Sequence, residues 1–175
     1  MYTTSKDIII KAKKGGYAVP AFNCENLEMV QAIIAAAEET KSPVLLQTTP
    51  STVKYLTLRQ AYAMVKAEAD AASVPVSLHL DHCESYEGVC DALDAGYSSV
   101  MIDASKLPFD ENIALTAKTV AEAHRRGIPV EAELGTVGGK EDSRSASIAY
   151  TDPDQALEFY SKTGIDIFAV AIGTA

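Results

Sequence analysis

Six short segments rich in β-forming residues alternate along the chain with segments that have the apolar spacing of helices. A parallel sheet needs a crossover after each strand, usually a helix, so this alternation indicates an α/β protein. The connections that lead into the strands carry Pro or Gly, as in Lys-Ser-Pro-Val and Arg-Gly-Ile-Pro-Val. The pattern predicts parallel strands within the ranges 18–22, 43–47, 75–80, 98–102, 129–134 and 166–172.

The segments between these strands have helical periodicity. Leu27, Val30 and Ile34 fall on one stripe of a helix, and Gly96 and Gly164 stand where two later helices should stop. Helices with a single apolar stripe cover a sheet from one side. The sequence predicts helices over 25–40 and 57–71, from 85 to 96, from 110 to 127, and from 152 to 164.

Two α/β architectures compete, a doubly wound open sheet and a (β/α)8 TIM barrel, and the polar residues favour the barrel. His79 and Asp81 are two residues apart and share one face of their strand, as do Glu131 and Glu133. Doubly wound strands usually bury apolar residues on both faces, and no GxGxxG motif follows the first strand. Barrel enzymes place polar groups at the carboxyl ends of several strands, which suits Asn23, Gln47 and Asp103.

The number of strands falls short of a closed barrel. Such a barrel has eight strands and typically about 250 residues, whereas this chain has 175 residues and six β segments. No low-complexity linker or change in composition divides it. We therefore expect residues 1–175 to form a single barrel-type domain that is truncated at its C-terminus, with the last strands lying beyond it.

Composition narrows the partners. The net charge is −9 and no run is rich in Lys or Arg, which argues against nucleic-acid binding. The longest apolar runs are too short to cross a bilayer. Three irregularly spaced cysteines with no CxxC motif indicate free thiols in a reducing cytoplasm. A small-molecule substrate is the expected partner.

The stretch SLHLDHC at 77–83 ends a strand in ionisable residues. His82 at this tip, with Asp103 and Glu133 at neighbouring strand ends, has the chemistry of a divalent-metal site. A purely structural histidine is the alternative, because catalytic zinc usually takes three protein ligands and no short zinc motif is present. Asp81 has two interpretations of equal weight: a carboxylate that orients a neighbour, or a general acid/base beside the metal.

Two further features bear on the chemistry. Glu131 and Glu133 face inward together, and a metal or a cationic partner would relieve the cost of burying them. The glycine-containing polar range 134–147 is either a flexible surface loop or a lid that brings Glu141 or Asp142 over the site. No lysine lies within a predicted strand, which argues against a Schiff-base mechanism.

Taken together, six stretches of the chain resemble the class II, zinc-dependent ketose-bisphosphate aldolases. They follow the family's order and cover almost the whole chain. The resemblance implies a (β/α)8 barrel that acts in cytoplasmic carbohydrate metabolism (glycolysis) as a homodimer or homotetramer. The stretches are AFNCENLE at 21–28, VPVSLHLDH at 74–82, GYSSVMIDAS at 96–105, ENIALT at 111–116, VEAELGTVGGKED at 130–142 and TGIDIFAVAIGTA at 163–175.

The resemblance also implies a role for each matching residue. Asp81 corresponds to the proton donor and acceptor on the aldehyde-side oxygen, and His82 to the first ligand of the catalytic zinc. Asp103 and Glu133 correspond to positions that hold a second or alternate metal, either a divalent or a monovalent cation. Glu141 corresponds to the acid/base that exchanges the proton of the dihydroxyacetone-phosphate enediolate. Two residues correspond to substrate contacts: Asn23 and Thr49.

The implied reaction is aldol cleavage or condensation of fructose or tagatose 1,6-bisphosphate, with dihydroxyacetone phosphate and glyceraldehyde 3-phosphate as the other side of the equilibrium. Zinc would polarise the ketone and stabilise the enediolate. The alternatives are an inactive fragment or non-catalytic remnant of the fold, and a class II aldolase for another phosphorylated ketose. A lysine-imine aldolase is a third; inhibition by a chelator and no trapping by borohydride would exclude it.

The chain departs from the family at several positions. Cys83 stands where the family often has Gly, and Cys24 where it often has an aliphatic residue; both are expected as small core residues, with thiol chemistry at the site as the alternative. In the family a zinc-binding histidine commonly follows the sequence IGTA, and a third histidine lies further on. The 175 residues end at IGTA.

We therefore expect the 175-residue chain alone to bind catalytic zinc poorly and to be inactive, since it supplies one zinc histidine of three. The measurement is cleavage of fructose and tagatose bisphosphates by the purified chain with added zinc. Normal zinc-dependent turnover would contradict this expectation.

Overall fold

The strands form one parallel sheet whose order follows the chain. The computed structural model describes residues 1–136 and 150–173. Each strand pairs in parallel with the next one along the chain, whereas the order of a doubly wound sheet reverses at a switch point. The sheet is thus a six-stranded half-barrel. Its strands are β1 (Ala21–Asn23), β2 (Val44–Thr48), β3 (Val76–Cys83), β4 (Ser99–Ile102), β5 (Val130–Leu134) and β6 (Ile167–Val170).

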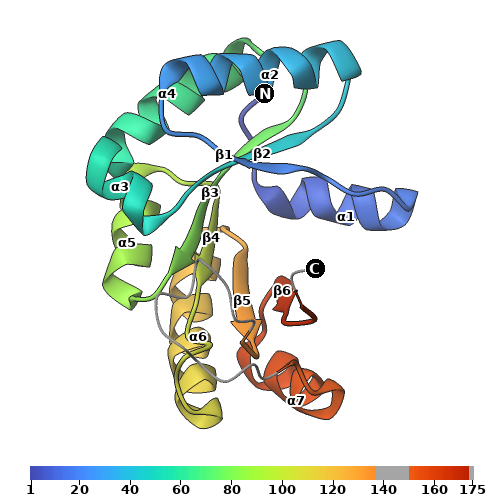
Figure 1. Ribbon diagram of the computed structural model, residues 1–175, viewed down its shortest axis with the longest axis vertical. Coiled ribbons are helices and arrows are strands. Elements are labelled where there is room, and N and C mark those ends of the chain that lie inside the picture. The colour runs from blue at the N-terminus through green and yellow to red at the C-terminus, as the bar shows by residue number, and fades with distance from the viewer. Residues whose placement is uncertain (137–149, 174–175) are drawn as a thin grey trace.

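The helices between the strands cover the outer face of the sheet (Figure 1). All five predicted helices are present with small shifts at their ends. Two helices, α1 and α3, were not predicted. No helix in the described part of the chain is long and apolar enough to span a membrane. The helices are α1 (Ser5–Gly15), α2 (Leu27–Thr40), α3 (Pro50–Leu56), α4 (Leu58–Ala71), α5 (Tyr86–Ala95), α6 (Phe109–Arg125) and α7 (Pro153–Thr163).

Local signals explain why the helices begin and end where they do. The side chain of Asn26 accepts a hydrogen bond from the amide of Met29 at the start of α2, and Asp152 does the same for two amides of α7. Helix α3 is also capped by a side chain, because Thr49 stands at its N-cap and Pro50 occupies its first turn. Helix α5 ends at Gly96, whose φ of 106° lies in the left-handed region.

Alternation along the strands separates an apolar outer face from a polar inner face. On β3, Leu78 and Leu80 point outward into the core beneath the helices, and His79 and Asp81 point inward. The thiols of Cys24 and Cys83 lie in the outer core, as expected for small core residues. The outward strand residues of this core are Val44, Leu46, Val76, Leu78, Leu80, Val100, Ile102, Val130 and Ala132.

Helix α1 lies on the other side of the sheet, against the amino-terminal ends of the strands. Tyr2 bridges to Val76 at the start of β3, and Ser5 Oγ donates a hydrogen bond to Ser99 Oγ at the start of β4. Figure 1 shows α1 on the side opposite to the covering helices. Helix α1 therefore covers the end of the half-barrel at which the strands begin.

The two outer strands are open within the described residues, where β1 pairs only with β2 and β6 only with β5. Phe22 on β1 and Val170 on β6 are each 48% exposed. A groove of about 790 Å³ beside β1 is lined by residues that include Tyr17, Phe22 and Ile33. These open edges agree with a barrel that is incomplete in this part of the chain.

Asp166 joins three elements just before β6. Its carboxylate accepts hydrogen bonds from Lys6 Nζ of α1 at 2.9 Å and from the Val130 amide of β5 at 3.0 Å. The Nε2 atom of His124 on α6 lies 2.7 Å from it. Burial by itself raises the pKa of Asp166, but these three hydrogen bonds hold it below its usual value.

We expect Asp166→Asn to lower the free energy of unfolding at pH 7 by about 1–3 kcal/mol, because charge-assisted hydrogen bonds are lost. The folded-state pKa is lowered, so this contribution exists above the unfolded-state pKa and disappears as the pH falls through the folded-state value. Denaturant titration at pH 7 and at acid pH measures both effects. The matched control is Asp91→Asn, an exposed carboxylate on α5, and equal losses in the two variants would contradict the assignment.

Candidate active site

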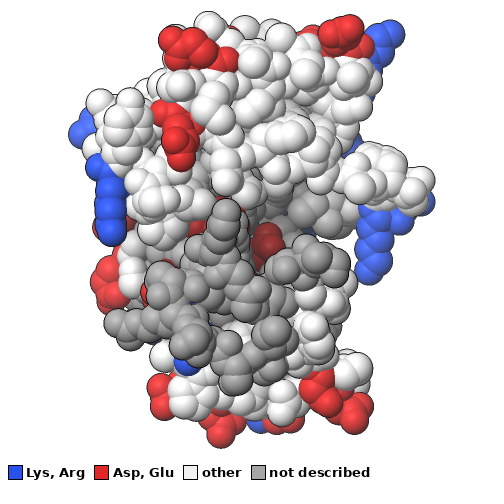
Figure 2. Space-filling model, in the orientation of Figure 1, with Lys and Arg blue, Asp and Glu red and all other residues white. Residues whose placement is uncertain are grey.

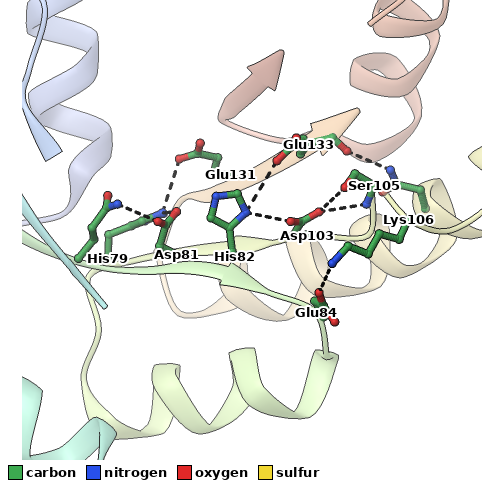
Figure 3. Close-up of polar contacts among 11 residues, drawn as sticks. His79, Asp81, His82, Glu84, Asp103, Ser105, Lys106, Glu131 and Glu133 are labelled. Carbon is green, nitrogen blue, oxygen red and sulfur yellow. Dashed lines mark hydrogen bonds and ion pairs between the residues drawn. The ribbon is translucent and has the colours of Figure 1, made fainter. Parts of the chain in front are cut away.

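The carboxyl end of β3 carries the ionisable residues, and its backbone is irregular there. The backbone of His82 has a φ of 49°, in the left-handed region that residues other than glycine rarely adopt. The register between β3 and β4 also shifts between Leu80 and Cys83. Adjacent residues of a regular strand point to opposite faces. The bend lets Asp81 and His82 reach the same rim (Figure 3).

Three side chains from consecutive strands meet at this rim. His82 Nδ1 of β3 lies 2.9 Å from Oδ2 of Asp103, which follows β4, and 3.9 Å from Oε2 of Glu133 on β5. One ligand atom from each residue falls within 4.8 Å of the others. One imidazole and two carboxylates, each partly accessible, suit a divalent metal that keeps a position open for substrate. The fold thus brings together the three predicted metal-site residues.

The hydrogen bond from His82 to Asp103 dominates the electrostatics of this group. It raises the pKa of His82 to about 9, assisted by the charges of Asp81 and Glu133 and opposed by burial. Burial raises the pKa of Asp103, but hydrogen bonds from His82 and Ser105 outweigh it and lower the pKa below its usual value. The Ser105 hydroxyl lies 2.7 Å from Asp103 Oδ1. The raised pKa of His82 favours an imidazolium–carboxylate pair, and a metal ion bound to His82 would have to displace its proton.

Asp81 lies beside this group and is held from the neighbouring strand. Gln47 Nε2 of β2 donates a hydrogen bond of 2.7 Å to Asp81 Oδ2, and His79 Nε2 lies 3.9 Å from Asp81 Oδ1. The side chain of Asp81 is 15% exposed. A carboxylate that is oriented, accessible at the rim and adjacent to the candidate metal group has the geometry of a general acid/base.

Glu131 occupies the inner face one step deeper than Glu133. Burial, followed by the charge of Asp81, raises the pKa of Glu131 to about 7. Its Oε2 atom lies 3.6 Å from Nε2 of His79, whose pKa is lowered to about 3 by burial and by His82. The neighbour of Glu131 is thus a neutral imidazole. Proton uptake is one way to relieve the cost of burying Glu131, and relief by a metal or a cationic partner stays a prediction.

The remaining site predictions fall into two groups. Asn23 ends β1 and is exposed, and Thr49 follows β2, where its hydroxyl caps α3. Both residues therefore lie at the carboxyl-end rim. Thr49 follows β2, which pairs with the strand that carries Asp81, and Asn23 lies one strand further away, on β1. Glu141 and Asp142 lie outside the described residues, as does most of the range 134–147. Sequence reasoning had noted Gln47 only as a strand-end polar residue, without its contact to Asp81.

Comparison with known proteins matches this geometry. Residues 3–175 match the family model described as "Fructose-bisphosphate aldolase class-II". The chain belongs to this family. It is 49% identical over 172 residues to the probable fructose-bisphosphate aldolase of Bacillus subtilis strain 168, and 46% identical over 175 residues to the fructose-bisphosphate aldolase of Staphylococcus aureus strain Mu50.

A solved structure supports the architecture. The crystal structure of the YdjI aldolase from Escherichia coli K12 superposes with a TM-score of 0.88 at 40% identity, covering 100% of this chain and 62% of that one. The alignments with the two bacterial relatives cover 96% and 97% of this chain but 60% of each relative. Family membership and the barrel-type fold are thereby confirmed, and the chain spans about 60% of the length of these relatives.

The His82–Asp103 pair predicts a pH dependence of stability in the presence of a chelator. The folded-state pKa of His82 is raised, so its contribution is complete below the unfolded-state value near 6.5 and is lost as the pH rises through about 9. We expect the denaturant midpoint to fall between pH 6.5 and pH 9.5, and to fall less in Asp103→Asn. Glu131 titrates in both proteins, so the difference between them isolates His82. Identical pH profiles would contradict the assignment.

Proposed function

We propose that this chain carries part of the active site of a class II aldolase that cleaves a ketose 1,6-bisphosphate into dihydroxyacetone phosphate and glyceraldehyde 3-phosphate. Fructose and tagatose bisphosphates are the leading substrates, and the names of the two bacterial relatives favour fructose. The observation that carries the proposal is the position of Asp81, at one rim with His82, Asp103 and Glu133. Figure 2 shows part of an acidic residue at the bottom of a hollow in the middle of one face.

In this proposal His82, Asp103 and Glu133 hold a divalent metal ion, and the expected ion is zinc. The resemblance to the family also implies a position for a second cation. A bound zinc supplies Lewis-acid polarisation of a ketone carbonyl. The residues themselves supply the negative charge that attracts the ion, and Ser105 orients Asp103 from behind. Such outer hydrogen bonds set the direction of a ligating carboxylate.

Asp81 handles the proton on the aldehyde side. When the substrate bond between C3 and C4 breaks, the electron pair of that bond stays on C3. The C4 hydroxyl becomes the aldehyde oxygen, so the hydroxyl proton must leave. The carboxylate of Asp81, held by Gln47, accepts that proton and returns it in the condensation direction. We assign the proton exchange on the dihydroxyacetone-phosphate side to Glu141, and substrate contacts to Asn23 and Thr49.

A lysine-imine mechanism fits the rim poorly. Lys106 lies on the loop that follows β4, close to Asp103 in sequence. Its Nζ atom pairs with Glu84 at 2.8 Å, and its side chain is 47% exposed. A Schiff-base lysine needs desolvation to lower its pKa, and an ion-paired, solvated ammonium lacks it.

A second candidate is a class II aldolase for another phosphorylated ketose. It is supported by the 40% identity to the YdjI aldolase of Escherichia coli K12, an aldolase that is not named for fructose. For either substrate we propose a cytoplasmic homodimer or homotetramer, in keeping with the family and with three free cysteines.

The test is a chimera in which residues 1–175 are joined to the remaining C-terminal segment of the Bacillus subtilis relative. We expect zinc-dependent cleavage of fructose or tagatose bisphosphate that a chelator abolishes. Asp81→Asn should lower kcat by about 10²- to 10⁴-fold, the typical contribution of a general acid/base, without loss of bound zinc.

Asp91→Asn, on the outer surface of α5, is the matched carboxylate control and should leave kcat unchanged. A folded chimera that binds zinc but cleaves neither sugar would reject these substrates and point to the second candidate. A folded chimera that binds no zinc would instead favour a non-catalytic remnant of the fold.

A further inference from the structure

His79 is a buried imidazole that neither the metal group nor the proposed proton transfer uses. It lies in the middle of β3, is 2% exposed and points into the half-barrel. Placing an imidazole in an interior is costly unless its polar atoms find partners. Its two ring nitrogens have different surroundings, and that difference determines where its proton resides.

A chain of two serine hydroxyl groups connects helix α1 to the Nδ1 atom of His79. Ser5 Oγ of α1 donates to Ser99 Oγ at 2.7 Å, and Ser99 Oγ lies 2.7 Å from His79 Nδ1. Both serines are fully buried. Since the Ser99 oxygen accepts the Ser5 proton, its own proton is available for Nδ1. A neutral imidazole has one acceptor and one donor nitrogen, so the proton of His79 then resides on Nε2.

The Nε2 atom faces the two carboxylates of the inner face. It lies 3.6 Å from Oε2 of Glu131 and 3.9 Å from Oδ1 of Asp81. Both separations exceed a direct hydrogen bond, but in a buried setting the orientation of the N–H dipole still matters. If Nε2 carries the proton, the positive end of its N–H dipole faces the carboxylates and the interaction is attractive. In the Nδ1–H tautomer the lone pair of Nε2 would face them, and the interaction would be repulsive.

We propose that Ser5 and Ser99 fix His79 in its Nε2–H tautomer, and that His79 thereby acts as a positioning residue for Asp81 and Glu131. Gln47 holds one oxygen of Asp81, and the imidazole N–H faces the other. The chain of contacts runs from α1, beneath the barrel, to the rim. The catalytic consequence rests on the proposed function of Asp81, whereas the tautomer itself does not.

The direct test is nitrogen NMR of the 175-residue chain labelled with ¹⁵N-histidine. The chain has three histidines, so His82→Asn and His124→Asn variants assign the His79 signals. We expect an unprotonated, pyridine-like Nδ1 and a protonated, pyrrole-like Nε2 in the wild-type chain. A protonated Nδ1 would overturn the proposal, and this result needs no variant at position 79 or 99.

The serine relay is tested by substitution. Ser99→Ala should move both His79 nitrogens toward the values of mixed tautomers, and Ser99→Thr, which keeps the hydroxyl, should restore the wild-type pattern. The control is Ser77→Ala. Ser77 lies on β3 and is also fully buried, but its hydroxyl pairs with Ser98. An unchanged spectrum in folded Ser99→Ala, or an equal change in Ser77→Ala, would overturn the relay.

The positioning role is tested in the active chimera. Ser99→Ala should lower kcat roughly 10- to 100-fold, as expected when a reacting group is misoriented. KM and zinc content should stay unchanged, and Ser99→Thr should recover the rate. A kcat that does not respond to Ser99→Ala would overturn the positioning role. If the tautomer is as expected but the chimera is inactive, the proposed function fails and the tautomer assignment stands.

Discussion

The alternation of side chains along parallel strands governs both the stability and the chemistry of this molecule. Outward positions such as Leu78, Leu80 and Val100 form the core beneath the helices, and inward positions carry His79, Asp81 and other ionisable groups. The strands run in parallel in chain order, so all their carboxyl ends meet at one rim. A single geometric rule thus produces both an apolar outer layer and a polar site.

The strained backbone at His82 is the one departure that the site requires. A regular strand would send Asp81 and His82 to opposite faces, and the left-handed conformation with its register shift sends both to the rim. The strain is confined to one residue, and the hydrogen bond from His82 to Asp103 helps to offset it. Backbone strain and the geometry of the site coincide at His82.

Burial of charge is managed in three different ways within a few ångströms. His82 and Asp103 form an ion pair, Glu131 takes up a proton near neutral pH, and His79 stays neutral between a serine and two carboxylates. Each outcome follows from the surroundings. The hydrogen bond to Asp103 favours the charged form of His82, whereas burial together with a like charge favours the neutral forms of Glu131, beside Asp81, and of His79, near His82. Residues of the same type therefore have different protonation states in one site.

Much of this architecture could be read from the sequence, because it depends on periodicities that survive in one dimension. The six strands, five of the helices and the inward pairing of His79 with Asp81 follow from spacing, and the family follows from its motifs. Helix α1 was missed because three consecutive isoleucines at 8–10 obscure its helical periodicity, and α3 because a Thr-Pro cap is also typical of a turn.

The sequence by itself determined which residues are ionisable, which strand each occupies and which face each shares. Only the tertiary structure decided which of them touch and which carry a proton. Distances between strands depend on register and on the bend at His82, and protonation depends on burial and on neighbours that are far apart in the chain. The contact of Ser5 with Ser99, 94 residues apart in the chain, is of this second kind.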